Sequence, residues 1–241
     1  MLFAQYQNIL SPNVMQQLQE NYLGDDIHWK HRGFGRFFRY LTEEEHNLVL
    51  DDLYSSDPNN PLFGDKWLMR NQHMYMQKFI PESWLPMHRE KCYGVVTIYV
   101  NPDSDWADQP QPKFVYYDTT DLKLLDDYKH TFPIHFNSGT YSITPEHKTP
   151  EFTAYHKVEY NKSDVDRVCL QIFYGPGGKG QIYRNNEAKF DNYADEKKDY
   201  TERSLMSGSL DVPGFLEMSD VSKQFNEDHA EIISRLEGNT V

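Results

Sequence analysis

Two histidines and one carboxylate in this chain have the residue types and the spacing of a metal site. His88 and Glu90 are two residues apart, just before the apolar run from Tyr93 to Val100. A further histidine, His156, comes later in the chain. Residues two apart lie on the same side of a strand, so the first pair could bind one ion if its segment is extended. Two imidazoles and a carboxylate can hold non-haem Fe(II) and leave coordination positions open for a co-substrate and dioxygen.

A second pair with the same spacing, His229 and Glu231, lies in a different backbone context. Its segment has helical spacing of apolar residues and ends at Gly238. On a helix, side chains two positions apart point in nearly opposite directions, so this pair cannot easily bind one ion. His88 instead precedes a β-branched and aromatic run, which favours an extended chain. The pair at His88 is therefore the candidate metal motif.

Arg167 is the candidate anchor for an anion, because a guanidinium can bind a carboxylate through two hydrogen bonds. It begins a strand-like run, Arg167 to Tyr174, and turn residues separate that run from a strand-like segment at 152–160. If the two segments pair as an antiparallel hairpin, His156 lies opposite or diagonal to Arg167 on one face. Positions 167, 169, 171 and 173 would then line a pocket.

Tyr75 and Gln77 are candidate contacts for the co-substrate. They alternate with Phe79 just before the metal motif. Alternate residues of a strand share a face, so at least one of them can face the site, although core packing explains the same pattern.

In these residues the chain resembles a known family, the Fe(II)- and 2-oxoglutarate-dependent oxygenases, and within it the prolyl-hydroxylase-like branch. The resemblance covers residues 71–175 and is carried by LPMHREK, IYVNPDSDW and YHKVEYNKSDVDRVCLQIFYG. It implies that iron is bound by His88, Glu90 and His156. It also implies that Arg167 binds the far carboxylate of 2-oxoglutarate. The first motif departs from the family, because most members have aspartate where this chain has the longer glutamate.

The resemblance implies a mainly β fold, a double-stranded β-helix (jelly roll) core with flanking α-helices. The implied activity is hydroxylation of an amino-acid residue, of the prolyl type, or of a small metabolite, with release of succinate and CO2. The implied cofactors are Fe(II) and 2-oxoglutarate, with ascorbate as a further candidate, and the partner is a small-molecule or peptide substrate. The residues leave two alternatives open: a cupin-like metal enzyme that does not use 2-oxoglutarate, and a non-catalytic jelly-roll binding module.

Composition narrows the class of protein. A length of 241 residues fits one domain, and a net charge of −13 argues against a nonspecific nucleic-acid binder. Cys92 and Cys169 lie in predicted strands and do not suggest a disulfide scaffold, which favours a reducing, cytoplasmic compartment. We expect no signal peptide and no membrane span, because residues 1–10 lack a basic start and a long apolar stretch. Composition leaves the oligomeric state open.

We expect the single domain to have three parts: an N-terminal helical and strand support at 1–66, the β-helix core at 67–175, and a polar C-terminal extension at 176–241. In the extension, the charged segment 185–209 is either a lid over the site or a surface loop, and the segment that ends at Gly238 is a terminal helix.

The support should contain two helices and one strand. The first helix spans 11–24 with Ser11 as its N-cap, and the second spans 42–54 with a capping box from Thr42 to Glu45. Residues 28–40 interleave cations and aromatic residues. This pattern fits a strand with one solvated face, or part of a groove for an anionic or aromatic partner.

Overall fold

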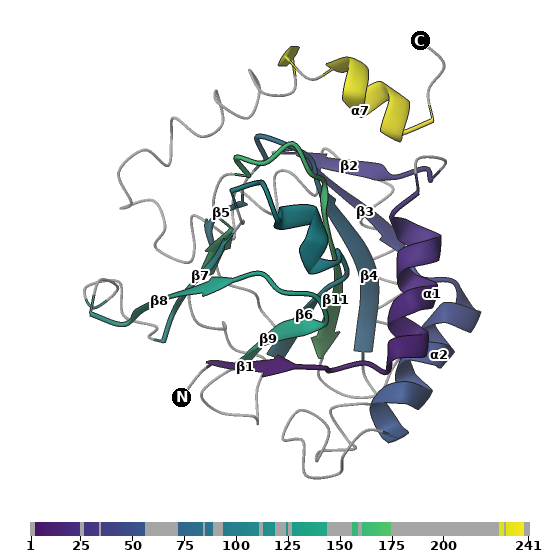
Figure 1. Ribbon diagram of the computed structural model, residues 1–241, viewed down its shortest axis with the longest axis vertical. Coiled ribbons are helices and arrows are strands. Elements are labelled where there is room, and N and C mark those ends of the chain that lie inside the picture. The colour runs from purple at the N-terminus through teal and green to yellow at the C-terminus, as the bar shows by residue number, and fades with distance from the viewer. Residues whose placement is uncertain are drawn as a thin grey trace.

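The computed structural model describes residues 3–24, 27–33, 35–55, 72–83, 85–88, 94–110, 113–118, 124, 127–143, 156–158, 161–174, 227–228 and 230–238. Over these residues the chain is mainly antiparallel β-sheet with few helices. Two sheets lie on either side of an interior, and helices α1 (Pro12–Tyr22) and α2 (Glu43–Ser55) lie along the outer side of the larger sheet (Figure 1). Among the described helices, none has both the length and the apolar character needed to span a membrane.

The larger sheet has seven strands in the order β1-β9-β6-β11-β4-β3-β2. Their bounds are β1 Phe3–Gln7, β9 Ser138–Ile143, β6 Gly94–Tyr99, β11 Arg167–Tyr174, β4 Gln72–Phe79, β3 Arg36–Tyr40 and β2 Lys30–Gly33. The smaller sheet has four strands in the order β5-β10-β7-β8. Their bounds are β5 Leu85–His88, β10 His156–Val158, β7 Lys113–Tyr117 and β8 Lys129–Pro133.

From β4 onward, the chain passes repeatedly between the two sheets. Strands β4, β6, β9 and β11 belong to the larger sheet, and β5, β7, β8 and β10 belong to the smaller one. Among the described strands of this part of the chain, only β7 and β8 follow each other within one sheet. Because of this winding, strands that are neighbours in a sheet come from distant parts of the sequence. β4 pairs with β11, and β5 pairs with β10.

Both predicted helices of the support are confirmed, together with their caps. The hydroxyl of Ser11 accepts a hydrogen bond from the Val14 N–H at 3.5 Å, at the start of α1. At α2, Thr42 and Glu45 bond to each other reciprocally, with backbone-to-side-chain distances of 2.8 and 3.2 Å. These bonds satisfy N–H groups that a helix start otherwise leaves without partners.

The larger sheet has two faces of different character, as the alternation along β4 and β11 predicts. One face packs against α1 and α2 and forms the main apolar core, which includes Met74, Met76, Val168, Leu170 and Ile172. The other face looks toward the smaller sheet. There Phe79, Tyr99 and Cys169 pack with Phe114 and Tyr116 of β7. The candidate site lies on this second, interior face.

The predicted hairpin of 152–160 with 167–174 is wrong. β10 pairs with β5 and β7 in the smaller sheet, and β11 pairs with β4 and β6 in the larger one. The segment between β10 and β11 connects the smaller sheet to the larger one. His156 and Arg167 therefore belong to opposite sheets instead of neighbouring positions of one hairpin.

The segment 28–40 contains two strands where the sequence pattern predicted one. β2 and β3 pair with each other around Gly35, whose φ of 66° lies in the region that glycine tolerates best. Helix α7 (Ala230–Leu236) packs against β2, and the Trp29 N–H donates to the Leu236 carbonyl at 2.7 Å. The predicted end of this helix is confirmed by Gly238, which has a φ of 73°. The candidate lid at 185–209 lies outside the described residues.

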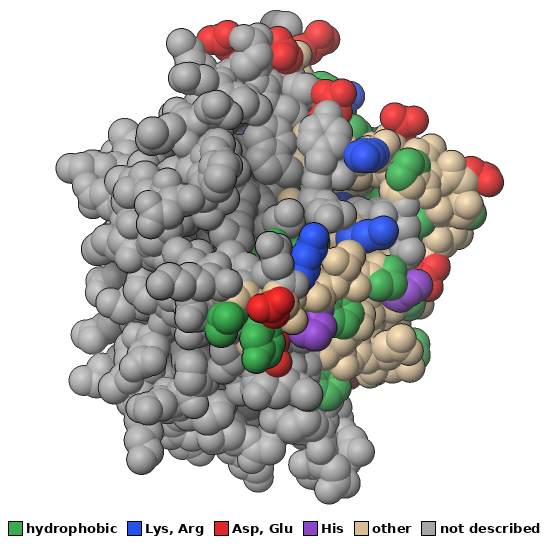
Figure 2. Space-filling view, turned by 90° about the vertical axis from the view of Figure 1, so that its left-hand side faces the viewer, with side chains coloured by type: hydrophobic (Ala, Val, Ile, Leu, Met, Phe, Trp, Pro, Cys, Tyr) green, Lys and Arg blue, Asp and Glu red, His purple; other side chains and the backbone are tan. Residues whose placement is uncertain are grey.

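Acidic side chains gather at the end of the molecule where α7 lies (Figure 2). Glu227, Asp228 and Glu231, in and just before this helix, are exposed. Over the rest of the described part of that face, acidic and basic side chains are interspersed. The described part of this face therefore offers no continuous basic surface for a polyanion, in keeping with the net charge of −13.

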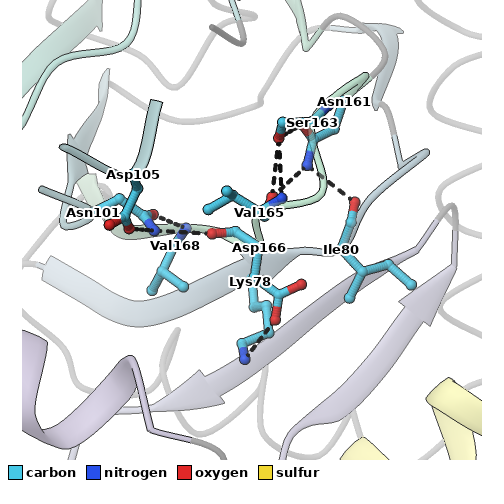
Figure 3. Close-up of polar contacts among 9 residues, drawn as sticks. All are labelled: Lys78, Ile80, Asn101, Asp105, Asn161, Ser163, Val165, Asp166 and Val168. Atoms are coloured by element: carbon cyan, nitrogen blue, oxygen red, sulfur yellow. Dashed lines mark hydrogen bonds and ion pairs between the residues drawn. The ribbon is translucent and has the colours of Figure 1, made fainter. Parts of the chain in front are cut away.

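A buried asparagine ties together the two turns in which β4 leads into β5 and β10 leads into β11. Asn161 is fully buried, and its backbone exchanges hydrogen bonds with Glu82 and Ser83, each at 2.8 Å. Its side chain donates to the carbonyls of Ile80 and Val165 and accepts from Ser163 (Figure 3). Both turns cross between the sheets, so this network holds the sheets together at one end.

Replacing Asn161 with alanine should lower the free energy of unfolding by about 3 kcal/mol, because buried carbonyl and hydroxyl groups lose their partner. Chemical denaturation of the purified variant measures this effect. The matched control is Asn21→Ala, which removes an exposed bond to Glu45 and should cost less than about 0.5 kcal/mol. Equal effects in the two variants would contradict a structural role for the buried network.

Candidate functional site

The two predicted histidine ligands are direct register partners. His156 of β10 pairs with His88 of β5 in the smaller sheet. Directly opposed residues of antiparallel strands have their Cα atoms about 4.5–5.5 Å apart. On its other side, His156 pairs with Tyr116 of β7. The fold thus brings together two residues that are far apart in sequence.

Part of the predicted metal motif lies among the described residues. Glu90 lies outside the described residues, and of His88 only the backbone is described. Among the described residues, no group of three or more His, Cys, Asp or Glu side chains could hold a metal. Metal binding by His88, Glu90 and His156 therefore stays a prediction, which the pairing of the two histidine positions supports.

Aromatic rings hold the imidazole of His156 in place. The side chain is buried, and its ring stacks on Phe114, with ring centroids 5.7 Å apart, and on Tyr116, with centroids 6.3 Å apart. The interplanar angles are 30° and 14°. Phe114 and Tyr116 belong to the apolar cluster that lies between the sheets. This imidazole is consequently an ordered group on the interior side.

Arg167 is a buried cation without a hydrogen-bonding partner among the described residues. It is 1% exposed, and none of its three side-chain nitrogens has a hydrogen-bond partner in the described part of the chain. Its guanidinium carbon lies 4.0 Å from the centroid of the Phe79 ring. Burial lowers the pKa of Arg167, but a guanidinium keeps its charge in proteins. An uncompensated buried charge is costly, so this position fits an anionic ligand.

Next to Arg167, Gln77 is a second buried polar group without a hydrogen-bond partner among the described residues. It is fully buried, and within the described residues neither its amide oxygen nor its amide nitrogen has a hydrogen bond. In the ladder of β4 and β11, Gln77 pairs with Cys169, while Phe79 pairs with Arg167. Gln77 and Arg167 are therefore diagonal neighbours on one face, within reach of one ligand.

A second guanidinium, Arg36, lies in the same row of the sheet. Arg36 pairs with Phe79, which in turn pairs with Arg167. Arg36 is 7% exposed. Burial raises the pKa of the Cys169 thiol to about 12, although Arg167 and Arg36 both oppose this shift. The cysteine is thus an unreactive thiol, and the two guanidinium groups make this part of the interior electropositive.

Sequence reasoning missed Arg36 as a residue of this region. The available signal was the alternation of cations and aromatic residues in 28–40, for which a groove for an anionic partner was one interpretation. The register of β3 against β4 selects Arg36 from that stretch, because it is the cation that shares the row of Phe79 and Arg167.

Tyr75 lies on the same interior face of β4, four residues before Phe79. It pairs with Gln171 and is 5% exposed. Its ring stacks on Phe173 with centroids 5.5 Å apart and meets Phe38 edge-on at 6.3 Å. Each two-residue step covers about 6.8 Å, so Tyr75 is more distant from the Arg167 row than Gln77 is.

No family model and no curated protein sequence matches the chain. Solved structures do share its fold. A prolyl-4-hydroxylase from Pseudomonas putida is 12% identical with a TM-score of 0.51, and the match covers 73% of this chain and 94% of that one. A viral collagen prolyl hydroxylase from Paramecium bursaria Chlorella virus-1, in a 2OG complex, is 10% identical with a TM-score of 0.51, covering 73% and 97% of the two chains. An oxidoreductase of the 2OG-Fe(II) oxygenase family from Burkholderia pseudomallei is 9% identical with a TM-score of 0.51, covering 73% and 85%.

In the ligand-free protein, replacing Gln77 with leucine should raise the free energy of unfolding by about 1 kcal/mol. Leucine removes two buried polar atoms that have no partners among the described residues, and it keeps a similar volume. Chemical denaturation measures the change. The control is Gln19→Leu, which should lower stability by about 1 kcal/mol because the Gln19 amide donates to the Val100 carbonyl at 2.9 Å. A loss of stability in the Gln77 variant would show that its amide is satisfied within the protein.

Proposed function

We propose that this protein is an Fe(II)- and 2-oxoglutarate-dependent oxygenase that hydroxylates an amino-acid residue, of the prolyl type, or a small metabolite. The observation that carries the proposal is the buried guanidinium of Arg167, which has no hydrogen-bond partner in the described chain. It lies on the sheet that faces the stacked imidazole of His156. An anionic co-substrate held between these two residues would compensate the buried charge.

We also propose that β4 to β11 form a double-stranded β-helix. The alternation of these strands between the two sheets supports this, as does the likeness of fold to the 2OG oxygenases named above. In such a fold a ligand can occupy the interior between the sheets, where the cluster of Phe79, Tyr99, Phe114 and Tyr116 excludes water.

Each of the site residues would have a separate role. His88, Glu90 and His156 would hold the iron, since two neutral imidazoles and a carboxylate match its preferred facial set. Arg167 would bind the far carboxylate of 2-oxoglutarate through two hydrogen bonds. The amide of Gln77 would donate to the same ligand, and Tyr75 would bound the cavity farther along the face.

When bound, Fe(II) and 2-oxoglutarate would supply the hydroxylation of a substrate C–H bond by dioxygen, with one oxygen atom entering the product, the other entering succinate, and CO2 released. The chain itself binds and orients these groups. Low polarity around Arg167 strengthens its attraction for a carboxylate, because water no longer screens the charges. The protein as a whole is strongly acidic, but Arg36 adds a second positive charge to the interior near Arg167. This local positive potential favours entry of a dianion.

A screen by mass spectrometry tests the proposed function. The protein is incubated with candidate peptides and metabolites, with Fe(II), 2-oxoglutarate, oxygen and ascorbate as reductant. The proposal expects products heavier by one oxygen atom and matching formation of succinate. A metal-dependent reaction without 2-oxoglutarate would identify a cupin-like enzyme. If the protein binds neither iron nor 2-oxoglutarate, it is a jelly-roll binding module.

Replacing either histidine of the pair should abolish iron binding. In His88→Ala and in His156→Ala, the site loses one of three protein ligands, and anaerobic titration with Fe(II) should show no tight site. The control is His229→Ala, which removes the histidine of the other His-x-acid pair and should leave iron binding intact. Retained tight binding in His156→Ala would refute the assigned ligand set.

Replacing Arg167 with lysine should raise the KM for 2-oxoglutarate strongly while iron binding persists. An ammonium is a point charge and does not reproduce the paired hydrogen bonds of a guanidinium with a carboxylate. Steady-state kinetics against 2-oxoglutarate concentration measures the effect, with Fe(II) titration as the internal control. An unchanged KM would assign the anchor to another cation, such as Arg36, Lys157 or Arg89.

A further inference from the structure

The backbone around Arg167 has a strand partner on one side only. Toward β4, the ladder of β11 continues to its first residue, where Arg167 pairs with Phe79. Toward β6, the strand pairing ends two residues later, where Cys169 pairs with Tyr99, and one further backbone bond runs from the Val100 N–H to the Val168 carbonyl at 3.0 Å. The Val168 N–H and the Asp166 carbonyl, on either side of the candidate anchor, receive no backbone bond from β6 in the described structure.

The side chain of Asn101 bonds to these two backbone groups. Its amide oxygen accepts a hydrogen bond from the Val168 N–H at 2.6 Å, and its amide nitrogen donates to the Asp166 carbonyl at 2.9 Å (Figure 3). The same nitrogen donates to the carboxylate of Asp105 at 3.0 Å, in the short helix η1 (Asp103–Trp106). This third bond sets which end of the amide faces each backbone group. Asn101 is 4% exposed, so water does not replace these bonds easily.

The two backbone bonds of Asn101 lie on either side of Arg167. They fix the N–H of the next residue and the carbonyl of the previous one, so they determine where the Cα of Arg167 lies and how its side chain leaves the strand. The guanidinium has no hydrogen bond of its own among the described residues and rests on the Phe79 ring. An ion pair of 3.0 Å between Lys78 and Asp166 supports the preceding residue from the other face.

We propose that Asn101 is a positioning residue for the co-substrate anchor: it holds the start of β11 so that the Arg167 guanidinium meets a carboxylate in a two-bond geometry. This inference rests on the proposed function. Asn101 would act through Arg167 and would not touch the ligand or the metal. Misplacing a binding group by about 1 Å from a distance can cost up to about 100-fold, so the effect is measurable.

The chain contains a matched control for the same chemistry. The side chain of Asn137 accepts from the Leu10 N–H at 3.0 Å and donates to the Leu10 carbonyl at 2.7 Å. It is 4% exposed, as Asn101 is. It joins the segment between β1 and α1 to the larger sheet, and it makes no bond to β11 in the described structure. Asn137→Ala therefore loses a similar pair of buried side-chain bonds, and these bonds hold Leu10 instead of the backbone beside Arg167.

The experiment measures the binding of 2-oxoglutarate to the full chain by calorimetry, under anaerobic conditions with saturating Fe(II). For Asn101→Ala we expect a dissociation constant for 2-oxoglutarate about tenfold higher than in the wild type, with an unchanged affinity for Fe(II). Asn137→Ala should match the wild type in both affinities. Hydrogen exchange should become faster at the Val168 amide in Asn101→Ala only.

A milder variant keeps the test informative if Asn101→Ala does not fold. Asp105→Ala removes the bond that orients the Asn101 amide and leaves both bonds to β11 possible, so 2-oxoglutarate binding should weaken by about twofold to threefold. If the wild type binds 2-oxoglutarate, and neither variant weakens that binding more than Asn137→Ala does, the positioning role is overturned. If the wild type itself does not bind 2-oxoglutarate, the proposed function fails, and the inference fails with it.

Discussion

A buried guanidinium that has no carboxylate partner among the described residues is the constraint on which the rest of this structure depends. Arg167 is held by its strand, by the ring of Phe79 and by backbone bonds on either side of it. None of these contacts neutralises its charge. Leaving a charge buried in this way costs stability, so the surrounding fold must be stable enough to tolerate it. The neighbouring amide of Gln77 adds to that cost. Both groups make physical sense if the interior is a binding site for an anion.

The stability that tolerates this interior comes from the opposite face of the same sheet. There the alternate residues of β4 and β11 pack against α1 and α2 in a continuous apolar core. Burying one large aliphatic side chain contributes about 1.5–3 kcal/mol, so a core of this size can offset several unsatisfied polar groups. The two faces of β11 therefore have separate tasks. Val168, Leu170 and Ile172 stabilise the fold, while Arg167 and Cys169 face the interior.

The passage of the chain between the sheets decides which residues meet. Each crossing places one strand in the larger sheet and the next in the smaller one, so β5 and β10 become neighbours although most of the core lies between them in sequence. Asn161 joins two of these crossings through buried hydrogen bonds. The same turn moves Arg167 out of the sheet of His156. If Arg167 is the anchor and His156 a metal ligand, as proposed, their places on opposite sheets allow them to hold the two ends of a small molecule.

The sequence by itself determined the features that depend on local interactions. The caps of α1 and α2, the alternation along β4 and β11, and the end of α7 at Gly238 all follow from residues a few positions apart. It also supplied the residue types of a metal motif and an anion anchor, and metal and anion binding by these residues stay proposals.

The tertiary structure alone decided which strands pair. The hairpin prediction failed because turn residues between two strands do not specify whether the strands share a sheet, and here buried bonds of Asn161 direct the crossing. The pairing of His88 with His156, the row from Arg36 to Arg167 and the hold of Asn101 on β11 likewise depend on register between strands distant in sequence, which no local pattern encodes.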